Sequence, residues 1–409
     1  MKKYIFHIDA NSAYLSWQAV YDLQHGKKVD LREIPSAIGG DKTKRRGIIL
    51  AKSIQAKKMG VKTGQPLFKA LLACPNLKIV PPDYQLYSRC SDAMVTVIQS
   101  FSDKVERFSV DECFMELPCE DPFEVAYRLK EKIRGTLGFT VNVGISTNKL
   151  LAKMASELEK PDKVHSIFEN EIKEKMWPLK VEELFMVGRA TWHKLHRYGI
   201  TTIGALATYD IDLLDRMMKS HGRLIWRYAN GIDISAVKTD SRQIKGIGNS
   251  TTTPFDVDDL KYASLFILSL TEMVALRLRA NHLMCQVIHV SYQRSSEGGM
   301  GKQRKMVNST DSTTAIYQVA MELFEEIWDK SPIRHFGVRV TSLNMADVYQ
   351  KSIFDEINLE KKRKLNQNID LLRLKYGSDS IKRASFISSG VNSISGGVYE
   401  DYPMMTSLL

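Results

Sequence analysis

Carboxylates end or interrupt the apolar strand patterns in the first part of the chain. The strand pattern 3–8 stops at Asp9, and Asp111 and Glu112 lie at the apex of a predicted hairpin between two further strands. Because such strands pack into a core, a carboxylate at their ends has to reach solvent or be neutralised by a cation. We therefore predict a sheet that gathers three carboxylates at its strand ends.

Three such carboxylates, one separated from the other two by about a hundred residues, suit a phosphoryl-transfer site with two metal ions. Two Mg²⁺ ions about 3.5–4 Å apart need several carboxylates, so that one ion activates the attacking oxygen and the other stabilises the leaving oxygen. An acidic pair in a turn is more often a solvated turn. Here the flanking residues 108–110 and 113–115 are mainly apolar, which favours a functional pair.

The pattern of strands and helices changes along the chain and indicates several domains. Residues 1–180 alternate strand and helix patterns, which is typical of an α+β domain. Residues 181–232 carry short helical patterns, and the polar, aperiodic stretch 233–244 is typical of a linker. Residues 245–345 follow the order βαββαβ, which predicts one sheet with two helices on one face, and a mixed, polar extension follows over 346–409.

The net charge and the spacing of the cysteines limit the classes of protein to which the chain can belong. The 409 residues carry a formal net charge of +11, which suits a polyanionic partner, although solubility alone also explains such a charge. Between Gly39 and Lys69 about nine basic residues stand against one acidic residue, a density typical of phosphate binding. The sequence has no apolar run near the ~20 residues of a membrane span, and its five cysteines show no C-x-x-C spacing. We expect a cytoplasmic protein with reduced thiols and no membrane segment.

Three motifs resemble the signatures of one enzyme family. They are His-Ile-Asp-Ala-Asn-Ser-Ala-Tyr at 7–14, Phe-Ser-Val-Asp-Glu-Cys at 108–113, and Gly-Ile-Ser-Thr-Asn-Lys-Leu-Leu-Ala-Lys at 144–153, which is followed by Lys160 and Pro161. In these motifs the chain is similar to the Y-family translesion DNA polymerases, in order from about residue 1 to residue 345. The resemblance implies a multidomain right hand, with palm and fingers over 1–180 (fingers at about 30–80), a helical thumb over 181–232 and a βαββαβ little finger over 245–345.

The resemblance also implies a role for each residue of the metal site. Asp9 and Asp111 would bridge two Mg²⁺ ions, with Mn²⁺ as an alternative. Glu112 would hold the ion that activates the primer 3′-hydroxyl, and the carbonyl of Ala10 would help to bind the second ion. Tyr14 matches the steric gate, an aromatic ring that leaves no room for a ribonucleotide 2′-hydroxyl. Without the motif, a tyrosine on an amphipathic helix would be interpreted as a core residue.

Some residues expected to contact the nucleotide differ from those of one subgroup of the family. Lys160 matches the palm lysine that grips the triphosphate, and Lys57 stands where the family has a fingers arginine. The chain has Ile-Gln-Ala-Lys at 54–57, whereas the DNA polymerase IV subgroup usually has Tyr-Glu-Ala-Arg. This pattern is closer to the polymerase V catalytic subunit and its relatives in Gram-positive bacteria. Because lysine offers a point charge in place of a bidentate fork, we expect the grip to be weaker or shared with Ser53 or Lys52.

DNA contacts are expected in the thumb and in the little finger. The usual Gly-x-Gly of the thumb appears only as Met-Val-Gly ending at Gly188, so we expect one backbone amide site for DNA phosphate to be lost or reshaped. In the last domain, Lys245 and the strand arginines Arg294, Arg304 and Arg339 are expected along the duplex phosphates. A basic strand face that is merely solvated is the alternative.

The extension after residue 345 carries a short motif of its own. Gln350, Ile353 and Phe354 belong to a pentapeptide that resembles the sliding-clamp-binding peptide of bacterial polymerases. The alternative is that Ile353 and Phe354 pack under a further helix near the basic run 361–364. The Ser/Gly-rich stretch 385–397 is expected to be loose.

The predicted function is DNA-directed DNA synthesis, the addition of deoxyribonucleotides to a primer 3′ end, in translesion synthesis during DNA repair or the SOS response. The expected partners of this monomer are primer–template DNA, deoxyribonucleoside triphosphates and a sliding clamp. A nucleotide cyclase also pairs strand-end acids on two metals, but it would not have a separate thumb and little finger. A non-catalytic DNA-binding scaffold would tolerate the loss of the three acids and of Lys160, all of which are present.

Overall fold

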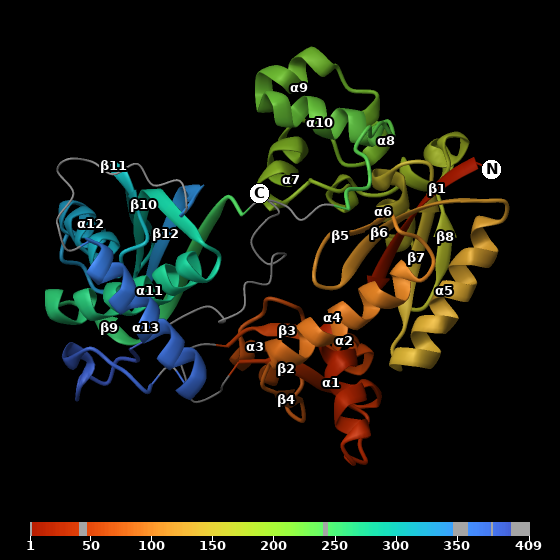
Figure 1. The fold of residues 1–409 in the computed structure, drawn as a ribbon. Coiled ribbons are helices and arrows are strands. Elements are labelled where there is room, and N and C mark those ends of the chain that lie inside the picture. The colour runs from red at the N-terminus through yellow and green to blue at the C-terminus, as the bar shows by residue number, and fades with distance from the viewer. Residues whose placement is uncertain (1, 41–46, 240–243, 347–358, 378, 394–409) are drawn as a thin grey trace. The chain divides into compact units, whose positions relative to one another are not determined.

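The computed structural model describes residues 2–40, 47–239, 244–346, 359–377 and 379–393, with the backbone alone at 359, 360 and 362. These residues form two compact units, one ending at 239 and one beginning at 244, which are described separately (Figure 1). Each unit has its own hydrophobic core. Among the described helices, none is long and apolar enough to cross a membrane.

The first unit is built on a five-stranded sheet in the order β5-β6-β1-β7-β8. Its strands are β1 (Lys2–Ala10), β5 (Val105–Arg107), β6 (Glu112–Cys119), β7 (Val141–Ser146) and β8 (Val164–Ser166). The central β1 pairs antiparallel with β6 and β7, and β5 pairs antiparallel with β6 in the predicted hairpin. Most of β1 is buried because helices cover both faces of the sheet.

Alternate residues of β1 point to the two faces of this sheet. The helices around it are α1 (Ala13–Gln24), α4 (Tyr84–Gln99), α5 (Pro122–Leu137) and α6 (Lys149–Glu157). Phe6 and Ile8 enter the core that contains α4 and α5, whereas Ile5 belongs to a cluster with α6. His7 and Asp9 have the parity of Ile5, so β1 presents both of them toward α6.

Helix α6 approaches the sheet very closely at Gly144 of β7. A Cβ atom at this position would stand 1.9 Å from the carbonyl oxygen of Ala152 and 2.5 Å from the amide nitrogen of Ser156. Any other residue would push the helix away from the strand, so a close backbone approach requires glycine here. This contact determines how near the side chains of α6 come to the ends of β1 and β6.

A small sheet in the order β3-β2-β4 follows α1 in the chain. This segment contains η1 (Leu31–Glu33), β2 (Ser36–Gly39), β3 (Ile49–Lys52), α2 (Ile54–Lys58), α3 (Leu67–Ala73) and β4 (Lys78–Val80). Ser53 begins α2, because its hydroxyl accepts a hydrogen bond of 3.1 Å from the amide of Ala56. The end of β3 and the start of α2 are thereby held beside the first turn of α1.

Short helices make up the rest of the first unit. They are η2 (Glu169–Glu171), η3 (Ile172–Met176), η4 (Val181–Glu183), α7 (Arg189–Arg197), α8 (Ile203–Ala207), α9 (Ile211–Met218) and α10 (Ser220–Ala229). Their core includes Leu150, Leu151 and Met154, which belong to α6. Helix α6 is therefore shared, with one side against the sheet and another in the helical core.

The second unit is a four-stranded antiparallel sheet in the order β11-β10-β12-β9. Its elements are β9 (Gly246–Val257), α11 (Leu260–Ala280), β10 (Leu283–Arg294), β11 (Gly299–Thr310), α12 (Thr313–Ile327), β12 (Ile333–Met345), α13 (Leu359–Tyr376) and η5 (Ala384–Phe386). The elements from β9 to β12 follow the predicted order βαββαβ. Helices α11 and α12 pack on one face of the sheet (Figure 1).

The end of the described chain completes the core of the second unit. Every residue of α11 from Leu265 to Leu278 is buried, so this helix has neighbours on all sides. Phe386 and Val391 are 6% and 7% exposed and belong to the same core as α11. The expectation of a loose stretch from residue 385 is therefore wrong as far as residue 393, because two apolar anchors hold an otherwise polar segment.

Candidate active site

Three carboxylates meet where β1, β6 and α6 come together. Asp9 at the end of β1 and Glu112 at the start of β6 are paired in the sheet register, and Glu157 is the last residue of α6. One oxygen atom from each of the three lies within 4.8 Å of the others. Oxygen atoms are the ligands that Mg²⁺ and Mn²⁺ prefer, so this donor set fits a divalent cation.

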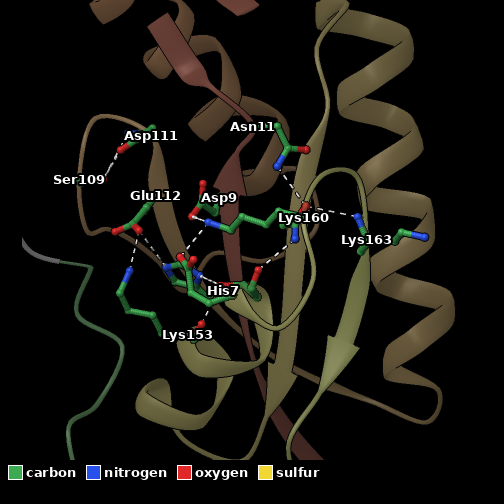
Figure 2. A network of polar contacts seen from close by, with 12 residues as sticks. His7, Asp9, Asn11, Ser109, Asp111, Glu112, Lys153, Lys160 and Lys163 are labelled. Carbon is green, nitrogen blue, oxygen red and sulfur yellow. Dashed lines mark hydrogen bonds and ion pairs between the residues drawn. The ribbon is translucent and has the colours of Figure 1, made fainter. Parts of the chain in front are cut away.

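Two lysines neutralise these carboxylates (Figure 2). Nζ of Lys160 lies 2.7 Å from Oδ2 of Asp9 and 2.8 Å from Oε1 of Glu157. Nζ of Lys153 lies 2.5 Å from Oε1 of Glu112. Each acid of the cluster therefore has an ammonium group within hydrogen-bonding distance, which offsets the repulsion among three neighbouring carboxylates.

Burial makes the Asp9 carboxylate costly to ionise. Burial raises the pKa of Asp9 to about 7, against the lowering effect of Lys160 and with a further raising effect of Glu112. Burial also acts to lower the pKa of Lys160, but Asp9 and Glu157 outweigh it and the pKa of this lysine is raised. Asp9 thus depends on a neighbouring cation to stay ionised near neutral pH.

His7 lies on the same face of β1 and is fully buried. Its Nδ1 is 2.7 Å from the hydroxyl oxygen of Ser156 on α6, and its Nε2 is 4.0 Å from Oε1 of Glu112. Burial is the largest cause that lowers the pKa of His7 well below its ordinary value, and nearby lysines add to it. The imidazole is therefore neutral, and the positive charge of the site comes from lysine.

The predicted ligand Asp111 lies in the turn just before β6. Its Oδ1 accepts a hydrogen bond of 2.6 Å from the hydroxyl of Ser109, and its backbone carbonyl accepts one of 2.9 Å from the amide of Ala10. The backbone contact places Asp111 beside the end of β1, while its carboxylate faces Ser109 (Figure 2). The structure brings Asp9 and Glu112 together and leaves the Asp111 carboxylate at the edge of the cluster.

A cavity of about 360 Å³ opens beside Asp9. Its wall includes the predicted nucleotide contacts Ser53, Lys57 and Lys160, and also Arg32. Several cations next to one carboxylate suit a polyanionic ligand such as a triphosphate, and the volume lies within the range of small-molecule sites.

Hydrogen bonds to other parts of the first unit position these cations. The guanidinium of Arg32 bonds the carboxylate of Asp30 and donates to the carbonyl of Gly138 at 2.9 Å. Lys52, which also lines the cavity, donates to the hydroxyl of Thr63 at 2.9 Å. Burial, followed by the charge of Lys57, lowers the pKa of Lys52. An incoming anion would offset the repulsion from Lys57 and favour the charged form of Lys52.

Tyr14 lies beside this cavity and is not among the described residues that line it. Its ring stacks on Tyr87 with centroids 4.5 Å apart and an interplanar angle of 11°. Tyr84 and Trp17 complete the aromatic cluster at 6.2 Å and 6.0 Å. Ser12 and Leu15, which are close to Tyr14 in the chain, form part of the cavity wall.

Two predicted DNA contacts lie on the helix-covered face of the second sheet. Arg304 of β11 is paired with the core residue Ile288, and its guanidinium bonds carboxylates of Glu322 and Glu326 on α12. Arg294, at the end of β10, has its Nη2 2.7 Å from Oδ2 of Asp329. Both arginines are therefore neutralised by acids of their own unit.

Arg339 lies on the opposite, open face of that sheet. It is paired with His289 of β10 and Gly248 of β9, and both Arg339 and Lys305 are exposed. A Cβ at Gly248 would lie 3.0 Å from Cβ of Arg339, so the glycine makes room for the arginine. Among the remaining predicted contacts, Lys245 is exposed just before β9, and Gly188 is the residue before α7 in extended backbone.

The predicted clamp-binding residues Gln350, Ile353 and Phe354 lie outside the described residues. Three residues of the site were missed by sequence reasoning, namely Arg32, Lys153 and Glu157. Lys153 and Glu157 are four residues apart on one helix, a spacing that would have placed them on the same face. Arg32 carries no such signal, because only the fold of the small sheet brings it to the cavity.

The chain resembles known proteins over both of its units. The sequence model of the impB/mucB/samB family matches residues 8–157, and that of the C-terminal domain of the same family matches residues 244–353. The chain is 43% identical to DNA polymerase IV of Clostridium acetobutylicum, over 94% of this chain and 98% of the relative. It is 32% identical to DNA polymerase IV 2 of Bacillus subtilis, over 95% of each chain.

Solved structures confirm the predicted fold class. A Y-family DNA polymerase chimera of Dbh and Dpo4 superimposes with a TM-score of 0.73 at 22% identity, over 84% of this chain and 99% of that one. DinB from Sulfolobus solfataricus gives a TM-score of 0.54 at 22% identity, over 83% and 98%. Because the two family models cover more than half of the chain and the curated relatives match most of its length, this chain belongs to the impB/mucB/samB family, the Y family of DNA polymerases.

Proposed function

We infer that the chain is a DNA-directed DNA polymerase that extends a primer 3′ end in translesion synthesis. The observation that carries this function is the cluster of Asp9 with Glu112, in which Asp9 is hydrogen-bonded to Lys160 and lines a cavity together with several cations. Phosphoryl transfer needs a site that positions a triphosphate and neutralises developing charge, and these groups supply both. The family match over both units argues against a nucleotide cyclase.

The metal site is assigned to Asp9, Asp111 and Glu112, with the carbonyl of Ala10. Two Mg²⁺ ions bound there would activate the primer 3′-hydroxyl and stabilise the leaving oxygen. Asp111 joins this set by position, because its backbone is hydrogen-bonded to Ala10 at the end of β1. Lys153 and Lys160 neutralise Glu112 and Asp9 until metal cations take their place.

Lys160 and Lys57 are proposed to bind the triphosphate, with Lys52 and Arg32 as further cations of the same wall. The hydroxyl oxygen of Ser53 already accepts hydrogen bonds from the backbone. Its proton remains available to a phosphate oxygen. This shared grip compensates for the missing arginine of the fingers.

Tyr14 is proposed as the steric gate that excludes a 2′-hydroxyl. Its stacking on Tyr87 supports a ring that cannot yield to a bulkier sugar. Replacing Tyr14 with alanine should raise the ratio of ribonucleotide to deoxyribonucleotide incorporation. An unchanged ratio in a folded, active variant would assign Tyr14 to the core alone.

The open face of the second sheet is proposed to lie along the duplex, with Arg339 and Lys245 contacting phosphates. Arg294 and Arg304 support the sheet through their carboxylate partners and are not counted among the contacts. We assign palm and fingers to 1–180, the fingers to about 30–80, the thumb to 181–232, a linker to 233–244 and the little finger to 245–345. The enzyme would act as a monomer on cytoplasmic DNA.

Primer extension tests the function directly. The full chain is incubated with primer–template DNA and deoxyribonucleotides, with and without Mg²⁺, on undamaged and lesion-containing templates. We expect extension that requires the metal and continues past a damaged base. Failure to extend either template with Mg²⁺ or Mn²⁺ would overturn the proposal.

Gln350, Ile353 and Phe354 are proposed to dock in a sliding clamp. An amide and two adjacent apolar anchors suit the rim and floor of a small hydrophobic pocket. Replacing Ile353 and Phe354 with alanine should abolish clamp affinity and leave the melting temperature unchanged. Unaltered clamp binding in a folded double variant would eliminate this docking.

A further inference from the structure

Helix α13 turns its charged residues inward. Nη1 of Arg373 lies 2.6 Å from Oε2 of Glu272 on α11, and Nε of Arg279 on α11 lies 2.6 Å from Oδ2 of Asp370. All four side chains are at least about nine-tenths buried. The helix is therefore fastened to the second unit by ion pairs and not by an apolar stripe.

Four large apolar side chains near the end of α13 are exposed. They and their exposed fractions are Leu371 63%, Leu372 42%, Leu374 59% and Tyr376 63%. Leu365 is also exposed, but it lines a cavity with Arg279 and Asp370 on the side of α13 that faces α11. A helix on a folded domain normally buries such residues, and four of them within the last six residues suit an interaction surface. We call these four residues the α13 outer face.

Helix α13 also exposes basic residues. Lys361, Lys364 and Lys375 are exposed on the same helix. Of the acids on α13 whose side chains are described, Asp370 is buried and paired with Arg279. The surface is therefore both apolar and positive, and it suits an occupant with apolar and acidic side chains.

The chain itself contains such an occupant. Residues 394–409 lie outside the described part, and no lysine or arginine follows Arg383 in the sequence. Glu400 and Asp401 are its acids. They are surrounded by apolar residues, which are Val398, Tyr399, Tyr402, Met404, Met405, Leu408 and Leu409.

The root of this segment and α13 are attached to the same turn of α11. Oγ of Ser269 donates a hydrogen bond of 2.6 Å to the carbonyl of Asn392, and Glu272, three residues further along α11, holds Arg373. An 18-residue helix is about 27 Å long, whereas 16 residues in extended form reach about 53 Å. The segment can therefore span the whole of α13 from its anchor.

We propose that residues 398–409 dock on the α13 outer face, with Glu400 and Asp401 beside the lysines of that helix. The α13 outer face is thus an interaction surface for an acidic, apolar segment, filled by the chain's own end. This inference does not depend on the polymerase function, because no residue in it belongs to the candidate active site.

Photo-crosslinking in the full chain tests the docking. With p-benzoylphenylalanine at Tyr402, irradiation should join this position to peptides from 359–376, as mapped by mass spectrometry. The double substitution Leu371→Asp and Leu374→Asp should reduce the yield at least about fivefold. Leu72→Asp, at a leucine of α3 that is 79% exposed, is the matched control and should leave the yield unchanged. Crosslinks to other segments, or between two molecules, would overturn the proposal.

A binding measurement gives a second readout. The chain ending at Ser393 keeps every described residue, and a labelled synthetic peptide of residues 394–409 should bind it saturably by fluorescence anisotropy. The Leu371→Asp and Leu374→Asp variant should bind at least about tenfold more weakly, at an unchanged melting temperature. Lys364→Glu with Lys375→Glu should also weaken binding, less so at high salt. A peptide that binds the variant and the parent equally would contradict the docking.

Discussion

The sheet of the first unit and the sheet of the second unit treat charge differently. In the first, the carboxylates at the ends of β1 and β6 form ion pairs with two lysines. Lys153 belongs to α6, and Lys160 follows α6 in the chain. In the second, Arg304 on a strand is met by Glu322 and Glu326 of the helix that packs over it.

The difference between lysine and arginine as partners of carboxylates explains why the two arrangements suit different roles. A lysine ammonium is a point charge on a flexible stem, and it can leave a carboxylate when another cation arrives. An arginine held by two carboxylates in fixed geometry loses much more when it is displaced. The first arrangement suits a site whose charge is exchanged during a reaction, and the second suits a support. Breaking each arrangement should therefore have different consequences.

The largest effect is expected from the acids of the first sheet. Glu112→Ala or Asp111→Ala should reduce primer extension on the order of a thousandfold or more, because transition-state charge would lose its metal ligands. Glu116→Ala, on the same strand but paired with Lys104, is the control and should retain activity. DNA binding by gel shift should change little. Near-wild-type extension by the Glu112 variant would remove the two-metal assignment.

The arginine-paired acid Glu272 should matter for stability and not for chemistry. Glu272→Gln leaves Arg373 buried without its counter-charge and should cost about 3–5 kcal/mol in urea unfolding. Glu322→Gln, at an exposed pair, should leave the free energy of unfolding nearly unchanged. Equal losses would mean that burial does not separate the two kinds of pair.

The contribution of Glu272 to the free energy of unfolding should also depend on pH. Burial acts to raise the pKa of Glu272, but hydrogen bonds from Arg373 and Arg383 outweigh it and hold the pKa below its ordinary value of 4.5. A depressed pKa in the folded state stabilises the protein above about pH 4.5, and this contribution is lost as the pH falls through the folded-state pKa. The wild type should therefore lose its advantage over Glu272→Gln in acid. A difference that stays constant from pH 7 to pH 3 would contradict this linkage.

Substitutions on the two faces of the second sheet should affect DNA affinity differently. Arg339→Ala should weaken binding several-fold to about tenfold and lower the slope of affinity against salt by about one unit, as expected for one phosphate contact. Arg304→Ala should stay within about twofold, because its charge is already neutralised. Titration by anisotropy at two or more salt concentrations measures both variants. A larger effect of Arg304 than of Arg339 would reverse the assignment of the faces.

The smallest effect is expected from freeing a carboxylate of the first sheet. Lys153→Met removes the ammonium that bonds Glu112 and keeps a chain of similar length. Mn²⁺ should then bind the protein a few-fold more tightly in the absence of DNA, because a competing cation has gone. Electron paramagnetic resonance of free Mn²⁺ measures this. Weaker metal binding in the variant would show that Lys153 orients Glu112 more than it competes for it.

Much of the site could be predicted from short stretches of sequence. Asp9 and Glu112 stand out because carboxylates interrupt apolar strands, and the order βαββαβ follows from alternating periodicities. These signals are local, since a strand or helix pattern needs only its own residues. Lys57 and Lys160 were named by resemblance, and both line the cavity.

The sequence by itself thus determined which elements form and which acids end them, whereas the tertiary structure decided which way charges point. Arg304 and Arg339 look alike in sequence, but strand parity places them on opposite faces, and a register change of one residue would exchange them. On α13, Arg373 is buried because Glu272 of α11 holds it, whereas Leu371 and Leu374 are exposed. An uncompensated buried carboxylate costs more free energy than an exposed leucine side chain, and only the fold shows where that carboxylate lies.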